Sequence, residues 1–297
     1  MLRTIFMGTP DIAVPALRVL AARTAVQVVI TQPDRPAGRG NRLTPPPVKA
    51  EAERLGLPVW QPERLRDHED DPRLAGVDLA VVMAFGQILR QKVLDLPAHG
   101  CVNLHASLLP RWRGASPLQA ALRAGDPETG ISVMRMVRAC DAGPVYARHP
   151  LPLAQDATLP WLHDALADLA ATALDAFLAA WPPPLPEPQD ESQATHCGKL
   201  GTEHGRIDPA LAAVELARQV RAYTPAPGCW VPEGDGRLRI LAAHAVPGSL
   251  PPGTWAAAGD ALHLGTTDGI LAITRLQSPG GKPLPAADWL RGHDLPA

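Results

Sequence analysis

The sequence lacks several features that would fix its class at once. No apolar run among its 297 residues reaches the length of a membrane span, and the opening MLRTIFMGTPD is too polar for a signal peptide. The net charge is −2, so a general basic surface for nucleic acid is also missing, and any such contact must come from a local patch. These absences predict a cytoplasmic protein that does not bind membranes.

Cysteine is scarce and poorly spaced for metal or disulfide chemistry. Its four positions are widely scattered, and no two of them have C-x-x-C spacing: Cys101, Cys140, Cys197 and Cys229. Neither a zinc site nor a disulfide framework is indicated, and no metal site is predicted. The segment GTPDIA at residues 8–13 is not the G-x-G-x-x-G of a dinucleotide fold, and no serine stands in a G-x-S-x-G elbow. A nicotinamide cofactor and a covalent serine intermediate are therefore unsupported.

Buried strands alternating with helices are the main pattern in the first part of the chain. Residues 3–7 and 26–30 are predicted to be apolar strands on either side of a helix at 12–22. Strands without polar alternation are buried on both faces, which indicates a right-handed βαβ unit in a parallel sheet. We therefore expect an α/β fold whose N-terminal part is a Rossmann-like, doubly wound, mostly parallel sheet.

The length of the chain favours two domains. The pattern of strands and helices ends near residue 181, and PPPLPEPQDESQ opens a proline-rich stretch that is typical of an inter-domain connection. Short strands with regularly spaced turns follow, as in a small barrel. The expected organisation is a catalytic domain at 1–181, a linker at 182–205 and a small C-terminal OB-like β-barrel domain at 206–297.

The stretch CVNLHASLLPRWRGASP at residues 101–117 is the strongest candidate for an active-site loop. Asn103 and His105 stand two apart at the end of a strand, so their side chains project the same way. Asp141 lies on a later turn that should meet them beyond the carboxyl ends of the strands. An amide and an imidazole aimed at one point can stabilise an oxyanion, and a carboxylate can tune the imidazole or relay a proton. These residue types suit direct acyl transfer, although an isolated Asn-x-His pair is more often structural.

A second feature is a basic loop at residues 31–49, TQPDRPAGRGNRLTPPPVK. It contains three arginines and one lysine against the single acid Asp34. Arginine is well suited to contact phosphate, but a solvated loop with no such role is an equally good interpretation of the charge alone.

Several of these motifs together resemble a known family. NLHASLLP at 103–110, followed by DAG at 141–143, resembles the 10-formyltetrahydrofolate-dependent formyltransferases. Within that family, RWRGASP at 111–117, QPDRPAGRG at 32–40 and FMGTPD at 6–11 resemble the group that acts on methionyl-tRNA. The resemblance extends over nearly the whole chain, including the order of the domains.

The resemblance implies a function and a set of site residues. The chain is expected to transfer the formyl group of 10-formyltetrahydrofolate to the free amino group of methionyl-initiator tRNA, giving N-formylmethionyl-tRNA for translation initiation. No metal is required, and a monomer is expected. Asn103, His105 and Asp141 match the family's catalytic residues. The folate site is matched by two segments, comprising Ser107, Leu108, Leu109 and Pro110, and Met83, Phe85 and Gly86. Contacts to the tRNA are matched by Arg35, Arg39 and Arg42.

Two alternatives remain at this point. One is a formyltransferase of the same fold that acts on the amine of a sugar nucleotide or of glycinamide ribonucleotide. The other is a non-catalytic RNA-binding protein, which would have no need of the three catalytic residues. The C-terminal domain carries eight Lys and Arg against eight Asp and Glu, so its share in tRNA binding is expected to be small.

Overall fold

Two units make up the chain, of which the structure, a computed structural model, describes residues 1–37, 40 and 42–296. The first unit contains Met1–Gly114, Glu128–Pro152 and His163–Cys197. The second contains Ala115–Pro127, Leu153–Leu162 and Gly198–Ala297. Each unit is therefore assembled from separate stretches of sequence.

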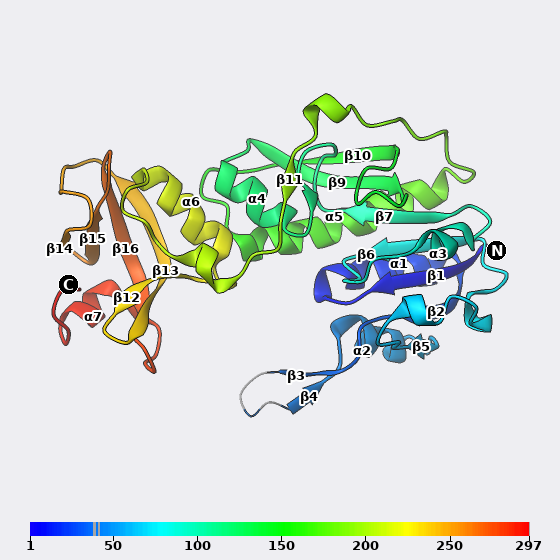
Figure 1. The fold of residues 1–297 in the computed structure, drawn as a ribbon, viewed down its shortest axis with the longest axis horizontal. Helices are drawn as coiled ribbons and strands as arrows, with labels where there is room; N and C mark the ends of the chain where they lie inside the picture. The colour runs from blue at the N-terminus through cyan, green and yellow to red at the C-terminus, as the bar shows by residue number, and fades with distance from the viewer. Residues whose placement is uncertain (38–39, 41, 297) are drawn as a thin grey trace. The chain divides into compact units, whose positions relative to one another are not determined.

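A seven-stranded sheet forms the first unit, in the order β10-β9-β7-β6-β1-β2-β5 (Figure 1). The five strands from β7 to β5 are parallel, β9 pairs antiparallel to β7, and β10 pairs antiparallel to β9. Their bounds are β1 (Arg3–Gly8), β2 (Ala25–Ile30), β5 (Val59–Trp60), β6 (Leu79–Met83), β7 (Cys101–His105), β9 (Glu128–Arg135) and β10 (Val145–Pro152). The predicted mostly parallel, Rossmann-like sheet is confirmed.

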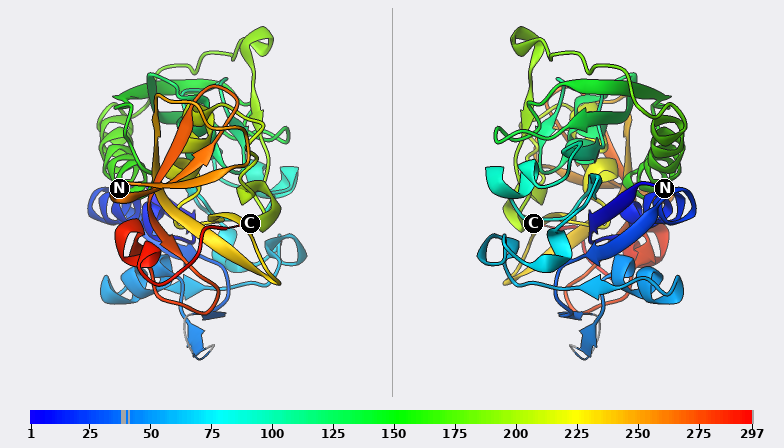
Figure 2. Two further views of the ribbon diagram at one scale, coloured as in Figure 1. Left: turned by 90° about the vertical axis from the view of Figure 1, so that its left-hand side faces the viewer. Right: turned by 90° about the vertical axis from the view of Figure 1, so that its right-hand side faces the viewer.

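Helices lie on both faces of this sheet. They are α1 (Val14–Arg23), preceded by the 3-10 turn η1 (Asp11–Ala13), then α2 (Pro47–Arg54), α3 (Gln91–Asp95) and α5 (Leu159–Ala179), with short turns η2 (Leu65–Asp67) and η3 (Pro72–Leu74). Helices α1 and α5 cover one face, and the segment with α3 covers the other (Figure 2). Arg23 Nε on α1 donates to Asp175 Oδ1 on α5 at 2.7 Å. Burial on both faces explains why β1 and β6 are apolar almost throughout.

The basic stretch after β2 contains a hairpin and the start of a helix, where the sequence predicted one long loop. Strands β3 (Arg35–Ala37) and β4 (Arg42–Thr44) pair antiparallel, and the hairpin extends away from the sheet of its unit (Figure 1). Helix α2 begins at Pro47, because proline at the first helical position needs no backbone N–H and already has helical φ. Gly38, Arg39 and Asn41 lie outside the described residues.

An antiparallel sheet forms the second unit, in the order β12-β13-β16-β15-β14, with β17 also paired to β16. Its strands are β12 (Cys229–Glu233), β13 (Gly236–Val246), β14 (Trp255–Ala258), β15 (Ala261–Gly265), β16 (Ile270–Gln277) and β17 (Leu284–Pro285). The long strand β13 carries two irregularities in its register with β16, a device that bends a small sheet. Helices α4 (Pro117–Ala124), α6 (Ala213–Tyr223) and α7 (Ala286–Leu290) complete the unit, as expected for a small C-terminal β domain.

The predicted linker is largely folded onto the first unit. Strand β11 (His196–Cys197) pairs in parallel with β8 (Arg113–Gly114), and the turn η4 (Glu191–Gln193) precedes it. Residues as far as Cys197 belong to the first unit, whereas the turn η5 (Thr202–Gly205) belongs to the second. The domain limits at 181 and 206 remain predictions. Within the described residues, no helix is both long and apolar enough to cross a membrane.

Candidate active site

Three neighbouring strands of the first unit end at the same edge of the sheet. Gly8 at the end of β1 is in register with Met83 at the end of β6, and Val82 is in register with Asn103 on β7. Ligands of doubly wound sheets bind beyond the carboxyl ends of their strands. The predicted site residues on β7 therefore lie where such a site is expected.

Asn103 is the only partly exposed residue of β7, in which its four neighbours are buried. Its position between Cys101 and His105 follows from strand alternation, which keeps these three side chains on one face of the sheet. Among the residues that the structure describes, none makes a hydrogen bond to the Asn103 amide. The amide is therefore available to a ligand oxygen.

His105 is buried, and both of its ring nitrogens face an oxygen acceptor. Nε2 lies 2.9 Å from the carbonyl oxygen of Trp112. Nδ1 lies 3.7 Å from Asp141 Oδ1, which is longer than a hydrogen bond but close enough for a charged ring to be attracted. The two contacts fix the plane of the ring and direct its Nδ1 edge toward the carboxylate.

Asp141 has a backbone that few residues other than glycine adopt. Its φ is +52°, in the left-handed region that aspartate tolerates better than most residues. The Gly114 N–H donates to Asp141 Oδ2 at 2.8 Å, which holds the carboxylate while Oδ1 faces His105. Gly114 itself must be glycine, because its φ is +118° and a Cβ there would overlap the carbonyl oxygen of Cys197.

Cys140 is next to Asp141 but is poorly suited to act as a nucleophile. Desolvation of the thiol and the neighbouring Asp141 carboxylate raise the pKa of Cys140 to about 11. The thiol is therefore neutral at physiological pH, and its Sγ lies 3.4 Å from Asp141 Oδ2, to which it can donate. Direct transfer without a covalent intermediate stays a prediction.

Two of the four residues in the first predicted folate segment, residues 107–110, are buried. Ser107 and Leu109 are buried; Ser107 Oγ donates to the Arg111 carbonyl at 2.5 Å, and the Leu109 N–H donates to Ser132 Oγ at 2.9 Å. Their observed contacts shape the loop. Leu108 and Pro110 are partly exposed and, with Leu109, line a pocket of about 600 Å³ whose wall includes Arg111 and Arg148.

The second predicted folate segment, residues 83–86, also contains both buried and exposed residues. The side chains of Met83 and Phe85 are buried in the core, so they could contribute to a ligand wall only through their backbone. The exposed residues of the segment are Ala84, whose φ is +48°, and Gly86. Ile88, which the sequence did not single out, exposes 89% of its surface. The sequence could have indicated Ile88, because it is an apolar residue that follows Gly86 just after the end of a strand.

The arginines predicted to contact tRNA stand on the β3–β4 hairpin. Arg35 and Arg42 are exposed, and Arg35 Nη2 lies 3.6 Å from Glu63 Oε2, itself exposed. Arg39 lies outside the described residues. Lys49, counted in the basic excess from sequence, makes an ion pair with Asp34 at 2.8 Å at the base of the hairpin. The arginines thus carry the positive charge of the hairpin.

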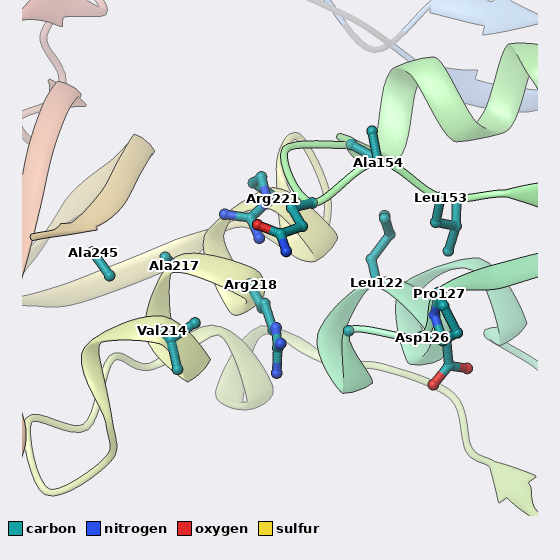
Figure 3. Close-up of a pocket in the computed structure, with 13 residues that line it drawn as sticks. Leu122, Asp126, Pro127, Leu153, Ala154, Val214, Ala217, Arg218, Arg221 and Ala245 are labelled. Carbon is teal, nitrogen blue, oxygen red and sulfur yellow. The ribbon is translucent and has the colours of Figure 1, made fainter.

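A pocket of about 530 Å³ lies within the second unit, between helix α6, the end of α4 and the loop after β10 (Figure 3). Arg218 and Arg221 of α6 contribute its two cations, and Asp126 is the acid that lines it. Burial and the neighbouring Arg218 lower the pKa of Arg221. No group of three or more His, Cys, Asp or Glu side chains that could hold a metal ion occurs in the described part of either unit.

Solved structures share the fold of the whole chain. The N-formyltransferase of Helicobacter canadensis, solved in complex with folinic acid and dTDP-3-aminofucose, superposes with a TM-score of 0.71 over 92% of this chain and 98% of its own. HypX of Aquifex aeolicus, in complex with tetrahydrofolic acid, gives a TM-score of 0.62 over 97% of this chain and 47% of its own. Their sequences are 13% and 18% identical to this one, so the likeness is one of fold.

Other proteins have sequences much more similar to this chain than those of the two solved structures. The methionyl-tRNA formyltransferase of Halorhodospira halophila is 49% identical over 99% of this chain and 97% of its own length. That of Granulibacter bethesdensis is 47% identical over 98% of this chain and 94% of its own. The family models for formyl transferase and for the formyl transferase C-terminal domain match residues 4–178 and 199–294. The chain therefore belongs to the formyltransferase family, and within it to the methionyl-tRNA formyltransferases.

Proposed function

We propose that the chain transfers the formyl group of 10-formyltetrahydrofolate to the α-amine of methionyl-initiator tRNA, with Asn103, His105 and Asp141 as the catalytic residues. The observation that supports this most directly is the arrangement at the end of β7. An unpartnered amide stands two residues from a buried imidazole, and that imidazole faces a carboxylate held by the Gly114 N–H.

Each of the three residues has a definite task in this proposal. The attacking amine forms a C–N bond to the formyl carbon while the bond from that carbon to N10 of the donor breaks, and the amine proton ends on N10. Asn103 donates to the formyl oxygen, where negative charge develops. His105, with Nε2 held by the Trp112 carbonyl, directs Nδ1 toward the reacting atoms and Asp141. Asp141 orients the ring and helps move the proton.

The proposed folate site lies on the segment after β6. An aromatic ring system needs an exposed apolar surface and nearby backbone groups. Ile88 supplies the former, and the exposed backbone of Ala84 and Gly86 supplies the latter. The residues present therefore fit the group. Met83 and Phe85 would position this segment from the core, where the Phe85 carbonyl accepts from Thr9 Oγ1 at 3.0 Å.

Two features are proposed to contact the tRNA. The hairpin offers Arg35, Arg39 and Arg42, whose planar guanidinium groups suit phosphate. In the second unit, Arg218 and Arg221 form a local pair of cations, although the region from residue 206 onward carries no net charge. This pair would give the second unit a modest share of the binding energy.

The proposed setting is a monomer in the cytoplasm. All three proposed catalytic residues come from one chain, so a second copy is not needed to complete the site. Sedimentation of the purified protein at assay concentration tests this part of the proposal: a stable dimer would contradict it.

The function is tested by supplying 10-formyltetrahydrofolate with three acceptors side by side: methionyl-initiator tRNA, methionyl-elongator tRNA and a UDP-linked amino sugar. Formylation of the initiator tRNA alone is the expected result. Formylation of the amino sugar alone would retain the catalytic residues and reject the tRNA assignment. Binding of tRNA without any formylation would support a non-catalytic RNA-binding protein.

A further inference from the structure

Residues 187–197, here called the strap, run across the active-site loop and are tied to it by backbone hydrogen bonds. The Thr195 N–H donates to the Pro110 carbonyl at 3.2 Å, and the Arg113 N–H donates to the Thr195 carbonyl at 2.9 Å. The Trp112 N–H donates to Thr195 Oγ1 at 2.9 Å. The carbonyl of this same Trp112 contacts His105 Nε2, so the strap supports the residue that orients the imidazole.

Gln189 of the strap joins the active-site loop to the turn that carries Asp141. Its Oε1 accepts from Arg113 Nε at 3.0 Å and from Nη2 at 2.9 Å. Its Nε2 donates to the carbonyl oxygens of Asp141 at 2.8 Å and of Gly143 at 2.7 Å. An amide has two donor hydrogens and two acceptor lone pairs, so the hydrogen-bonding capacity of Gln189 is completely used.

Arg113 completes this connection from a buried position. Arg113 is 4% exposed to solvent, and Gln189 is 9% exposed. The guanidinium also donates to both carboxylate oxygens of Glu191, at 2.9 and 2.7 Å. A buried charge is tolerated only when it is paired and hydrogen-bonded, and Gln189 and Glu191 provide those partners. Arg113 is thereby fixed in one orientation, and it fixes Gln189 in turn.

The turn that Gln189 holds needs such support. Asp141 has a φ of +52°, and a Cβ at Gly143 would overlap the carbonyl oxygen of Arg135, so the turn lies tightly against the end of β9. Gln189 binds the backbone on both sides of Ala142, while the Gly114 N–H binds the carboxylate. The carboxylate is thus located by contacts from the loop and from the strap.

We propose that Gln189 and Arg113 are positioning residues for formyl transfer, which act by holding the Asp141 carboxylate opposite His105. This inference rests on the proposed catalytic role of Asp141. A residue that only stabilises the fold would change the free energy of unfolding and leave the rate per folded molecule unchanged. A positioning residue changes kcat with little effect on either KM, since a misplacement of about 1 Å can cost about a hundredfold in rate.

The sharpest variant is Gln189→Glu. It keeps an oxygen acceptor for Arg113 but removes the hydrogens that bind the carbonyls of Asp141 and Gly143. We expect kcat to fall by about tenfold to a hundredfold, KM for each substrate to stay within about twofold, and the pH profile of kcat to shift. Gln91→Glu is the matched control, because Gln91 is an exposed glutamine of the same unit outside the strap, and its amide donates to Asp95. Its kcat should equal that of the wild type.

A double-mutant cycle with Asp141→Asn distinguishes positioning from general damage. If Gln189 acts through the carboxylate, Gln189→Glu should cost less than about threefold once that carboxylate is gone, measured by single-turnover rates. An equal loss in both backgrounds would overturn the proposal, as would wild-type kcat in Gln189→Glu. Thermal unfolding of each variant shows that the assay is run on folded protein, and Arg113→Lys, expected to lose kcat in the same way, replaces Gln189→Glu if that variant does not fold.

The outcome also separates this inference from the proposed function. A wild-type protein that formylates no acceptor refutes the function itself. An active wild type with a fully active Asp141→Asn refutes the role of Asp141, and the positioning inference with it. An inactive Asp141→Asn beside a fully active Gln189→Glu refutes the positioning inference alone.

Discussion

The active-site loop and the β3–β4 hairpin are both polar, arginine-bearing segments of the first unit, but they are held in opposite ways. In the loop, Arg113 is buried and hydrogen-bonded to Gln189 and Glu191. On the hairpin, Arg42 is exposed, and its neighbour Leu43 exposes 68% of its surface. Arginine is thus a buried hydrogen-bonding residue in one segment and an exposed charge in the other.

This difference suits the two tasks that we propose for these segments. Stabilising charge during a reaction requires donors that are already in place, because reorganising them at the moment of reaction costs rate. Contacting a phosphate backbone requires mainly charge and reach, and such contacts are strongly weakened by salt. Variants in the loop should therefore change kcat, whereas variants on the hairpin should change tRNA affinity.

The largest effect is expected for Asp141→Asn. Loss of the carboxylate removes the partner of His105, and we expect the single-turnover rate to fall by about 10²–10³-fold. Binding of tRNA should change less than about twofold, since the residue is not on the proposed RNA surface. Rapid-quench measurements over a range of pH check this, and a normal rate at every pH would remove Asp141 from the mechanism.

The next largest effect is expected for Glu51→Gln in α2, the helix that follows the hairpin, and it concerns the free energy of unfolding. Glu51 of α2 is buried and accepts from Arg18 Nε at 2.6 Å and from Arg54 Nη2 at 2.7 Å, contacts that lower the pKa of Glu51 to about 2. A lowered pKa means that the ionised group stabilises the folded state above its unfolded pKa near 4.5. Glu51→Gln should therefore lower the free energy of unfolding by about 1–2 kcal/mol at pH 7.

That stabilisation is lost as pH falls from about 4.5 toward 2, because the unfolded chain takes up a proton at Glu51 over this interval while the folded protein, with its lowered pKa, largely does not. The difference between wild type and Glu51→Gln should shrink over the same interval, as measured by urea unfolding at several pH values. A difference that stayed constant down to pH 2.5 would show that the ion pairs are not its source.

A smaller effect is expected for Arg42→Ala on the hairpin. The dissociation constant for tRNA should rise by about tenfold at low salt, and the slope of log affinity against log salt should fall by about one, with kcat unchanged. Arg66→Ala is a suitable control, because Arg66 is an exposed arginine of the same unit outside the hairpin. Equal effects of the two substitutions would mean that the hairpin has no special role.

The smallest effect is expected for Arg221→Ala in the second unit. Its pocket also contains Asp126, so the local field is weak, and we expect tRNA affinity to fall by only about twofold to threefold at low salt. Filter binding at two salt concentrations would detect this. A loss larger than that of Arg42→Ala would reverse the proposed division of labour between the units.

Local sequence rules predicted many of the elements but not all of their contacts. Apolar runs without alternation predicted the parallel strands β1 and β2. The proline-rich stretch after residue 181 was predicted to be a linker, because its composition excludes a helix and gives no strand pattern. Its order comes instead from partners distant in sequence, including Arg113 and the Asp141 turn.

The sequence by itself determined the type of fold, the family and the placement of Asn103 and His105 on one face of a strand, because these depend on periodicity, on motifs and on residues two apart in one strand. Only the tertiary structure decided that Met83 and Phe85 are buried, that Lys49 is paired with Asp34, and that Gln189 reaches the Asp141 turn. The physical reason is that burial and hydrogen bonding depend on neighbours in space. Gln189 lies 48 positions from Asp141 in the chain, and no local pattern records that contact.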